Sequence, residues 1–239
     1  MGQSMRVIHD NLQAVRGRIA RAAAAAGRDP QSVTLLAVSK THPAGLVEEA
    51  FAAGQRAFGE NYVQEAVEKM DALATRVGEE RASALEWHFI GPLQSNKTRI
   101  AAARFDWVHT IESEKIARRL SAQRPAGMAA LNVLIQVNVS GEASKSGVAP
   151  EEVLFLAKEI NTLPRLKLRG LMAIPEPGAD VARYRELKNL YAELKDEFRF
   201  DTLSVGMSDD LEAAIAEGAT LVRIGSAIFG ARQAVRPAA

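Results

Sequence analysis

The sequence predicts an α/β fold, a single-domain (β/α)8 barrel of the TIM type preceded by an N-terminal helix. Short apolar segments rich in β-branched residues alternate with helical patterns along nearly the whole chain, as in parallel sheets whose strands are buried on both faces. About eight such strands within 239 residues fit a closed barrel. No linker rich in Pro, Gly or Ser divides residues 1–239, so we expect one domain.

The first predicted element is a helix over residues 5–26. This segment is amphipathic and rich in arginine, and it ends in the strongly helix-forming run Ala22–Ala26. An organelle transit peptide has a similar composition, but Asp10 favours a helix of the folded protein. No apolar stretch approaches the roughly 20 residues of a membrane span, and no secretory signal precedes the helix, so we expect a cytoplasmic protein with no membrane partner.

The elements that follow are read from apolar runs and from the helical patterns between them. The predicted strands are Thr34–Lys40, Ala57–Gly59, Trp87–Ile90, Trp107–Thr110, Leu131–Val139, Leu166–Ile174, Thr202–Met207 and Leu221–Gly225. The predicted helices are Ala44–Ala53, Val63–Arg76, Lys97–Ala103, Glu114–Ala122, Glu151–Asn161, Ala179–Phe198 and Asp209–Glu217. Pro43 and Pro150 stand where a first helical turn tolerates a missing amide proton. Gly54 and Gly218 stand just past helix ends, where a left-handed cap favours glycine.

An open, doubly wound sheet is the alternative to the barrel. Such sheets usually carry Gly-x-Gly-x-x-Gly after the first strand to bind a dinucleotide. Here the corresponding turn reads Lys40-Thr-His-Pro43. The barrel is therefore the better prediction.

Composition excludes several classes of function. The formal net charge is +1 at pH 7, so no overall field attracts nucleic acid. Cysteine is absent, which excludes disulfides, thiolate metal sites and cysteine nucleophiles. The four histidines show no metal-binding spacing such as His-Glu-x-x-His, and we expect no metal. His42, His88 and His109 fall at or near strand ends, so one of them could line a pocket.

Chemistry is expected where Lys40 and the turn Gly225-Ser226 meet. Lys40 ends the first predicted strand and Gly225-Ser226 end the eighth, and these strands are neighbours in a closed barrel. Glycine lets the backbone approach closely, and free amides at a helix start favour an anion. An amine beside an anion-binding turn suits an aldehyde that carries a phosphate, and pyridoxal phosphate is such a molecule. Partial desolvation would leave more of the lysine as a neutral, nucleophilic amine.

Three further residues are candidates for this site. Ser208 either donates its hydroxyl to a phosphate or caps the next helix, whose first turn would hold Asp209 and Asp210. Arg223 lies in an apolar strand and either pairs with a structural carboxylate or faces the pyridine nitrogen. Asn61 ends the second predicted strand and could touch the ring.

Several motifs in order resemble the YggS-type pyridoxal phosphate homeostasis proteins. The matching segments are Leu35–Lys40, Phe58–Glu65, Trp87–Lys97, Arg169–Met172, Ser204–Asp209 and Arg223–Gly230. The resemblance implies a barrel similar to the N-terminal domain of alanine racemase, with pyridoxal phosphate held as an internal aldimine of Lys40. By the same resemblance Ser208, Gly225 and Ser226 hold the phosphate, Arg223 faces the pyridine nitrogen, and Asn61 contacts the cofactor.

The resemblance implies a role in intracellular vitamin B6 homeostasis, as a buffer or carrier of pyridoxal phosphate whose recipients could be apo-enzymes. The alternative is a fold-type III amino-acid racemase or a related enzyme. Racemases of that type append a β-rich domain and use a tyrosine of the partner subunit. Only Ala231–Ala239 follow Gly230, and Tyr62 is the only nearby tyrosine, so we expect a monomer without dedicated turnover. A third option is a cofactor-free aldolase that uses Lys40 on a sugar phosphate.

Overall fold

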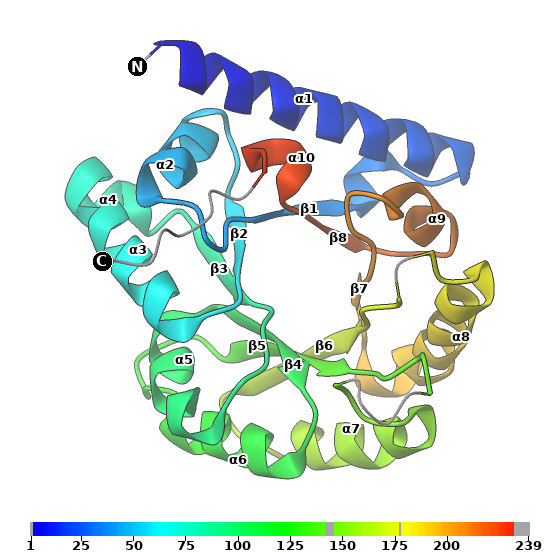
Figure 1. Ribbon diagram of the computed structural model, residues 1–239. Helices are drawn as coiled ribbons and strands as arrows, with labels where there is room; N and C mark the ends of the chain where they lie inside the picture. Colours follow the sequence, from blue (N-terminus) through cyan, green and yellow to red (C-terminus); the bar gives the residue numbers. More distant parts are fainter. Residues whose placement is uncertain (1, 142–145, 177, 232–239) are drawn as a thin grey trace, which may run out of the picture.

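The computed structural model describes residues 2–141, 146–176 and 178–231, with side chains described from residue 6 onward. Eight parallel strands form a closed barrel in chain order, and β8 pairs with β1 (Figure 1). The predicted barrel is confirmed. Of the tail Ala231–Ala239, all but the first residue lie outside the described residues.

The strands are β1 (Thr34–Val38), β2 (Ala57–Glu60), β3 (Glu86–Phe89), β4 (Trp107–Ile111), β5 (Leu131–Gln136), β6 (Leu166–Met172), β7 (Thr202–Ser204) and β8 (Leu221–Ile224). The α-helices are α1 (Gly2–Ala25), α2 (Ala44–Ala52), α3 (Val63–Val77), α4 (Glu79–Ala82), α5 (Thr98–Arg104), α6 (Glu114–Gln123), α7 (Val153–Asn161), α8 (Val181–Phe198), α9 (Leu211–Ala216) and α10 (Ser226–Phe229). Short 3-10 turns occupy Pro30–Ser32, Ser95–Lys97 and Pro150–Glu152.

All eight strands lie where the sequence predicts them, but several end earlier than predicted. β1 ends at Val38, because the chain turns away and Thr41 takes a left-handed conformation with φ 64°. β7 ends at Ser204, because Gly206 also takes a positive φ, of 102°. Lys40 therefore lies in a loop rather than in the first strand. The helices α4 and α10 are four residues long, too short to leave a periodic pattern in the sequence.

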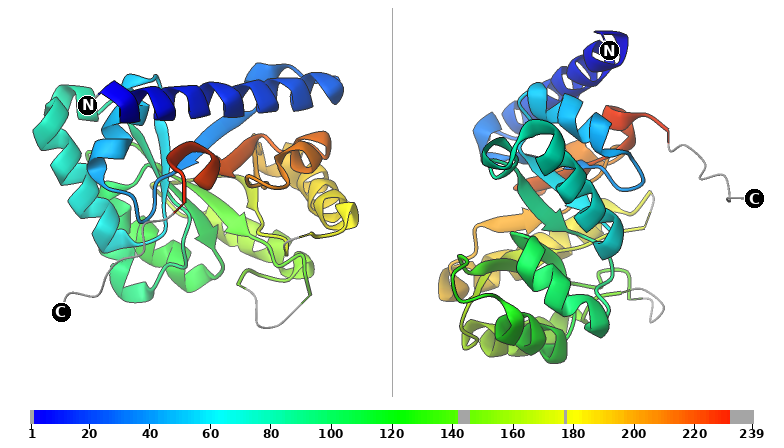
Figure 2. Two further views of the ribbon diagram at one scale, coloured as in Figure 1. Left: turned by 45° about the horizontal axis from the view of Figure 1, so that its top comes forward. Right: turned by 90° about the vertical axis from the view of Figure 1, so that its left-hand side faces the viewer.

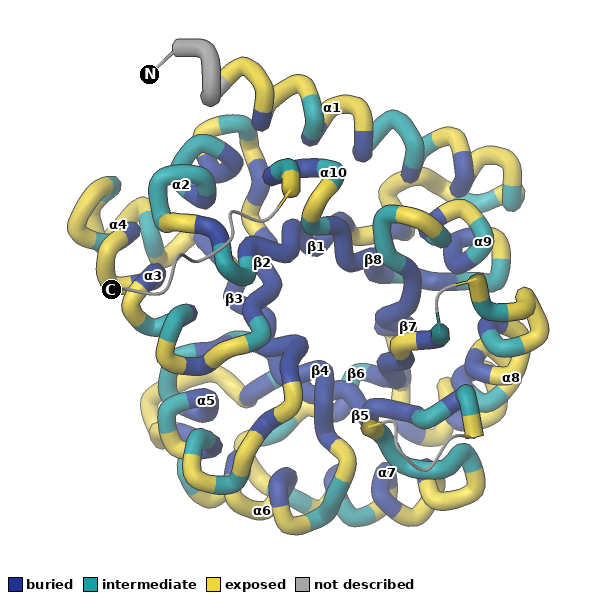
Figure 3. Tube along the Cα trace, viewed as in Figure 1, coloured by how far each residue is buried: buried dark blue, intermediate teal, exposed yellow. Residues whose placement is uncertain are grey.

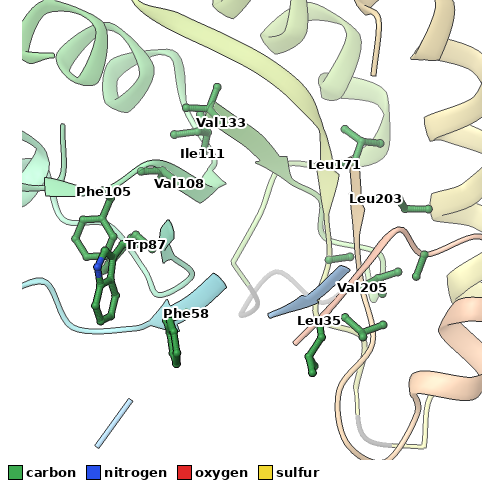
Figure 4. Packing of buried hydrophobic residues seen from close by; sticks show 14 of the residues in the cluster. Leu35, Phe58, Trp87, Phe105, Val108, Ile111, Val133, Leu171, Leu203 and Val205 are labelled. Carbon is green, nitrogen blue, oxygen red and sulfur yellow. The ribbon is translucent and has the colours of Figure 1, made fainter. Parts of the chain in front are cut away.

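Successive side chains of a strand point to opposite sides of the barrel wall and pack into different apolar clusters. Leu35 and Ala37 belong to the large cluster between the strands and the surrounding helices, whereas Leu36 and Val38 pack inside the barrel. Figure 4 shows part of the large cluster, including Phe58 and the other labelled residues. The burial colours show the buried strands ringed by helices with exposed outer sides (Figure 3).

Helix α1 lies across the outer side of β1 and β8 and contacts α2, α9 and α10 (Figure 2). Its buried residues Ile8, Leu12, Val15 and Ile19 recur at helical spacing and join the large cluster. None of the described helices is both long and apolar enough to cross a membrane. The first helix is thus an integral layer over the barrel seam.

We expect Leu12→Ala to lower the free energy of unfolding by about 2–5 kcal/mol, because the side chain is fully buried and leaves a cavity. Val7 lies on the same helix with 55% of its surface exposed, so Val7→Ala serves as the control and should change stability by less than about 0.5 kcal/mol. Denaturant titration measures both. Equal effects would show that α1 is not packed as described.

Candidate functional site

One pocket of about 320 Å³ opens at the carboxyl ends of the strands. All six residues singled out from the sequence line it, and they come from the loops after β1, β2, β7 and β8 and from β8 itself. The described lining residues are Val38, Lys40, His42, Asn61, Ile90, Ile174, Met207, Ser208, Asp209, Arg223, Gly225, Ser226 and Gly230. The barrel therefore brings together residues that are far apart in the chain.

The backbone on both sides of Lys40 is held by a buried ionic cluster. The Ser39 hydroxyl donates to Oε1 of Glu60 at 2.6 Å, and the Lys69 ammonium donates to the Ser39 carbonyl at 2.7 Å. Lys69 also lies 2.6 Å from Glu60, and both side chains are almost fully buried. This cluster fixes the residue that directly precedes Lys40.

Glu65 completes the cluster on the other side of Lys40. Its Oε1 accepts from the backbone amide of Thr41 at 2.6 Å and from Lys69 at 3.0 Å. Burial raises the pKa of Glu60, and the Lys69 ammonium only partly offsets that effect. The backbone at the half-buried Lys40 is therefore held in place, which limits the positions that its amine can reach.

This cluster is absent from the sequence predictions, although α3 carries a signal of it. The buried side of α3 consists of Val63, Ala66, Met70 and Leu73, and Lys69 lies within that apolar stripe. A lysine in such a position needs a buried partner. Glu65, one turn earlier, is a local candidate, but the choice of Glu60 depends on the packing of α3 against β2.

The loop after β8 begins α10 at the pocket wall. Gly225 is the N-cap residue of α10 and Ser226 its first residue, and amides in a first helical turn lack acceptors within the helix. A Cβ at Gly225 would lie 3.2 Å from the carbonyl oxygen of Val38, a tight contact. Glycine therefore lets this turn lie close against β1, beside the loop of Lys40.

Ser208 reaches the pocket from the loop between β7 and α9. The alternative in which it caps the following helix is wrong, because α9 begins at Leu211 with Asp210 at the N-cap position. Asp210 instead accepts from the Met207 amide, within the loop, and from the Tyr184 hydroxyl. Because Tyr184 belongs to α8, the second bond ties this loop to that helix. The Ser208 carbonyl accepts from Arg18 of α1 at 3.0 Å.

Arg223 points from β8 into the barrel, where it is 5% exposed. Its NH1 donates to the carbonyl and hydroxyl oxygens of Ser204 at 2.7 and 2.8 Å, and its NH2 donates to the Ala173 carbonyl at 2.9 Å. In the described part of the chain no carboxylate forms an ion pair with Arg223, so the alternative of a structural carboxylate partner is wrong. Burial lowers its pKa to about 10.

Of the three histidines expected near strand ends, His42 lines the pocket and its ring lies 5.2 Å from that of Phe229. His88 and His109 are fully buried in the barrel, and burial lowers the pKa of both, that of His109 well below its ordinary value. Asn61 lines the pocket, and its buried Oδ1 has no hydrogen-bond partner among the described residues. Tyr62, the tyrosine considered from the sequence, is 58% exposed and is not among the described residues that line the pocket.

Other cavities lack the same chemistry. One lies between α1 and the barrel beside Arg16 and Gln55, and another lies at the opposite end of the barrel beside Glu86, His88 and Arg169. Neither is lined by a lysine among the described residues. In the same part of the chain no group of three or more Asp, Glu or His side chains could hold a metal ion. The pocket at Lys40 is therefore the candidate site.

We expect Lys69→Met to lower the free energy of unfolding by about 3–5 kcal/mol, because it leaves the Glu60 carboxylate buried without its cation. The double variant Lys69→Met/Glu60→Gln removes both charges and should recover most of that loss. Denaturant titration of these two variants and of the single variant Glu60→Gln measures the coupling between the two residues. Additive losses would contradict a buried ion pair.

Stability should also depend on pH through His109. The folded protein keeps this ring neutral while the unfolded chain protonates it below about pH 6.5, so the free energy of unfolding falls as the pH falls further, by about 1 kcal/mol per unit. The groups that face His109 and His88 are Glu86, Asp106 and Arg223.

Denaturant titrations between pH 7.5 and 5.5 measure this slope. His109→Gln should reduce the slope, and the part that remains includes His88, whose pKa burial also lowers. An unchanged slope in His109→Gln would contradict a neutral buried His109.

Comparisons with known proteins agree with this fold and show the family of the chain. The family model described as alanine racemase, N-terminal domain, matches residues 11–233. The pyridoxal phosphate homeostasis protein of Pseudomonas aeruginosa is 58% identical over 98% of this chain and all of its own length. The protein of that name from Escherichia coli K12 is 55% identical over 95% of this chain and 98% of its own.

Among solved structures, PipY of Synechococcus elongatus with PLP bound superimposes with a TM-score of 0.78 at 36% identity. The match covers 93% of this chain and the whole of PipY. Sequence and structure agree over nearly the full length in each comparison. The chain therefore belongs to the family of pyridoxal phosphate homeostasis proteins, which share the barrel of the alanine racemase N-terminal domain.

Proposed function

We propose that this protein binds pyridoxal phosphate in the pocket between Lys40 and Gly225-Ser226, and that it buffers or carries this cofactor in vitamin B6 homeostasis. The observation that carries the proposal is the convergence of an amine, a helix start and a buried arginine on one pocket. The names of the relatives from Pseudomonas and Escherichia support it, as does the PLP bound to PipY.

The pocket residues match the polar groups of the cofactor, which are its aldehyde, its phosphate and its ring nitrogen. Lys40 supplies the amine for the aldehyde, while Gly225, Ser226 and Ser208 supply amides and hydroxyls for the phosphate. A volume of about 320 Å³ lies within the range usual for small-molecule sites. The unpartnered Oδ1 of Asn61 offers an acceptor to a polar substituent of the ring.

Arg223 is suited to the pyridine nitrogen. Its three hydrogen bonds within the protein leave two of the five N–H donors of a guanidinium for a ligand. The bound cofactor supplies an electron-withdrawing ring, and a cationic arginine leaves the ring nitrogen unprotonated, which weakens that electron sink. The residues therefore favour holding the cofactor over stabilising a substrate carbanion.

An amino-acid racemase is the alternative use of the same site. Racemisation needs a proton donor and acceptor on each face of the substrate. Besides Lys40, the described pocket residues that could exchange a proton are His42 and Asp209. His42→Asn and Asp209→Asn therefore test the alternative, because one of them should abolish turnover by a racemase, whereas a carrier should still bind its cofactor.

The proposal places the protein in the cytoplasm as a monomer that passes its cofactor to apo-enzymes. The absence of cysteine suits a reducing compartment. Size-exclusion chromatography with light scattering tests the monomer. Faster activation of a PLP-dependent apo-enzyme by the loaded protein than by the same concentration of free cofactor would support direct transfer, and equal rates would contradict it.

Absorption spectroscopy tests the binding proposal. Purified protein supplied with pyridoxal phosphate and then desalted should retain a visible absorption band, because a lysine amine and the aldehyde condense to a conjugated imine with loss of water. Lys40→Ala should lose the band, and Lys115→Ala, at an exposed lysine of α6, should keep it. A wild-type protein without the band would contradict the proposal and favour the cofactor-free aldolase.

Addition of D- or L-amino acids to the loaded protein separates carrier from enzyme. We expect the band to persist and the amino acid to keep its configuration, as followed by chiral chromatography. Sustained racemisation that His42→Asn or Asp209→Asn abolishes would contradict the carrier and establish the racemase.

A further inference from the structure

The inward-facing residues of β3, β4, β7 and β8 are polar in the middle of the barrel. Barrel interiors are usually filled by layers of branched apolar side chains. Here His88, His109, Ser204 and Arg223 occupy these positions, and none is more than 5% exposed. Buried polar groups at the centre of a barrel need hydrogen-bond partners, and the contacts of these four residues form a single line.

That line begins in the pocket and ends at the opposite end of the barrel. Arg223 NH1 donates to the Ser204 hydroxyl oxygen at 2.8 Å, and that oxygen lies 3.0 Å from Nδ1 of His109. Nε2 of His109 lies 2.8 Å from Nδ1 of His88. Nε2 of His88 lies 3.1 Å from Oε1 of Glu86, off the angle of a good hydrogen bond. The Glu86 side chain is 48% exposed.

The Glu86 end of the line determines the direction of the hydrogen bonds in it. An ionised carboxylate can only accept, so the nitrogen that faces it at 3.1 Å, Nε2 of His88, carries the proton of that ring. A neutral imidazole has one donor and one acceptor, so Nε2–H of His109 donates to Nδ1 of His88, and the Ser204 hydroxyl, which accepts from Arg223, donates to Nδ1 of His109. Burial disfavours a charge on either ring.

We propose that His88, His109 and Ser204 form a directional relay of hydrogen bonds through the barrel interior, oriented by the Glu86 carboxylate, that positions Arg223 from the far side of the molecule. Both histidines are neutral and carry their proton on Nε2. In this relay all four are positioning residues, and Arg223 alone reaches the pocket.

The surroundings of the relay keep it ordered. The indole of Trp107 stacks on His88 with ring centres 5.1 Å apart, and the Arg169 guanidinium lies 4.6 Å from the centre of the Trp107 ring. Each hydrogen bond of a chain polarises the next in a low dielectric. A change at Glu86, which solvent reaches, is therefore transmitted to the guanidinium in the pocket.

Nitrogen NMR of the cofactor-free protein tests the relay without reference to the proposed function. The sequence has four histidines, so single variants assign each ring in a two-bond proton–nitrogen correlation spectrum. We expect His88 and His109 to be neutral Nε2–H tautomers at pH 7. Glu86→Ala should also shift the signals of His109, which it does not touch. A proton on Nδ1 of either ring, or a charged ring, would overturn the relay.

A second experiment follows the effect on Arg223, and this part rests on the proposed function. Ser204→Ala removes the hydroxyl but keeps the Ser204 and Ala173 carbonyls that also bind the guanidinium. We expect pyridoxal phosphate affinity to fall about five-fold, the usual worth of one hydrogen bond, and the visible band of the bound cofactor to shift. Ser204→Thr retains a hydroxyl and should restore both.

Two variants of Glu86, at the end of the relay that is remote from the pocket, form a matched pair. Glu86→Gln keeps an oxygen beside Nε2 of His88 and should resemble the wild type, whereas Glu86→Ala should resemble Ser204→Ala in band position and affinity. Wild-type spectra and affinities in both Ser204→Ala and Glu86→Ala would overturn the relay. A wild type that binds no pyridoxal phosphate would contradict the proposed function instead, and the tautomers would then decide the relay alone.

Discussion

Closure of the barrel between β1 and β8 is the constraint on which the site depends. The pairs Thr34–Leu221 through Ala37–Ile224 join the two ends of the chain in parallel register. Because both strands then end at the same rim, Lys40 and Gly225-Ser226 line one pocket although nearly the whole sequence separates them. Helix α1 covers this seam from outside and holds the Ser208 carbonyl through Arg18.

Two sets of buried polar groups make the rim of this barrel rigid. The cluster of Lys69, Glu60 and Glu65 holds the loop of Lys40 at both adjoining residues. Arg223, on the other side, is held by backbone carbonyls that cannot change their charge. Burying these charges costs desolvation energy, and in return the backbone that carries Lys40 and the guanidinium of Arg223 are held in place before any ligand binds. Such preorganisation suits a protein that holds a reactive aldehyde.

The fold and the pocket residues could be predicted from the sequence because both follow from local patterns and from topology. Apolar runs located eight strands, and the convergence of strand ends in a barrel brought Lys40, Ser208 and Gly225 together. Several strand ends were placed too late; β1 and β7, for example, end before the backbone turns at Thr41 and Gly206 while the apolar pattern continues. The Lys69 cluster and the His88–His109 pair were missed, since choosing partners for buried polar groups requires the packing of distant elements.

The central claim, that Lys40 holds pyridoxal phosphate covalently in this pocket, is tested most directly by reductive trapping. Borohydride converts an imine between lysine and cofactor into a stable secondary amine, and peptide mass spectrometry then locates the modified lysine. The account predicts modification of the loaded protein at Lys40, with the label lost in Lys40→Ala. Trapping mainly at another lysine, or no trapping in a protein that retains the cofactor, would contradict it.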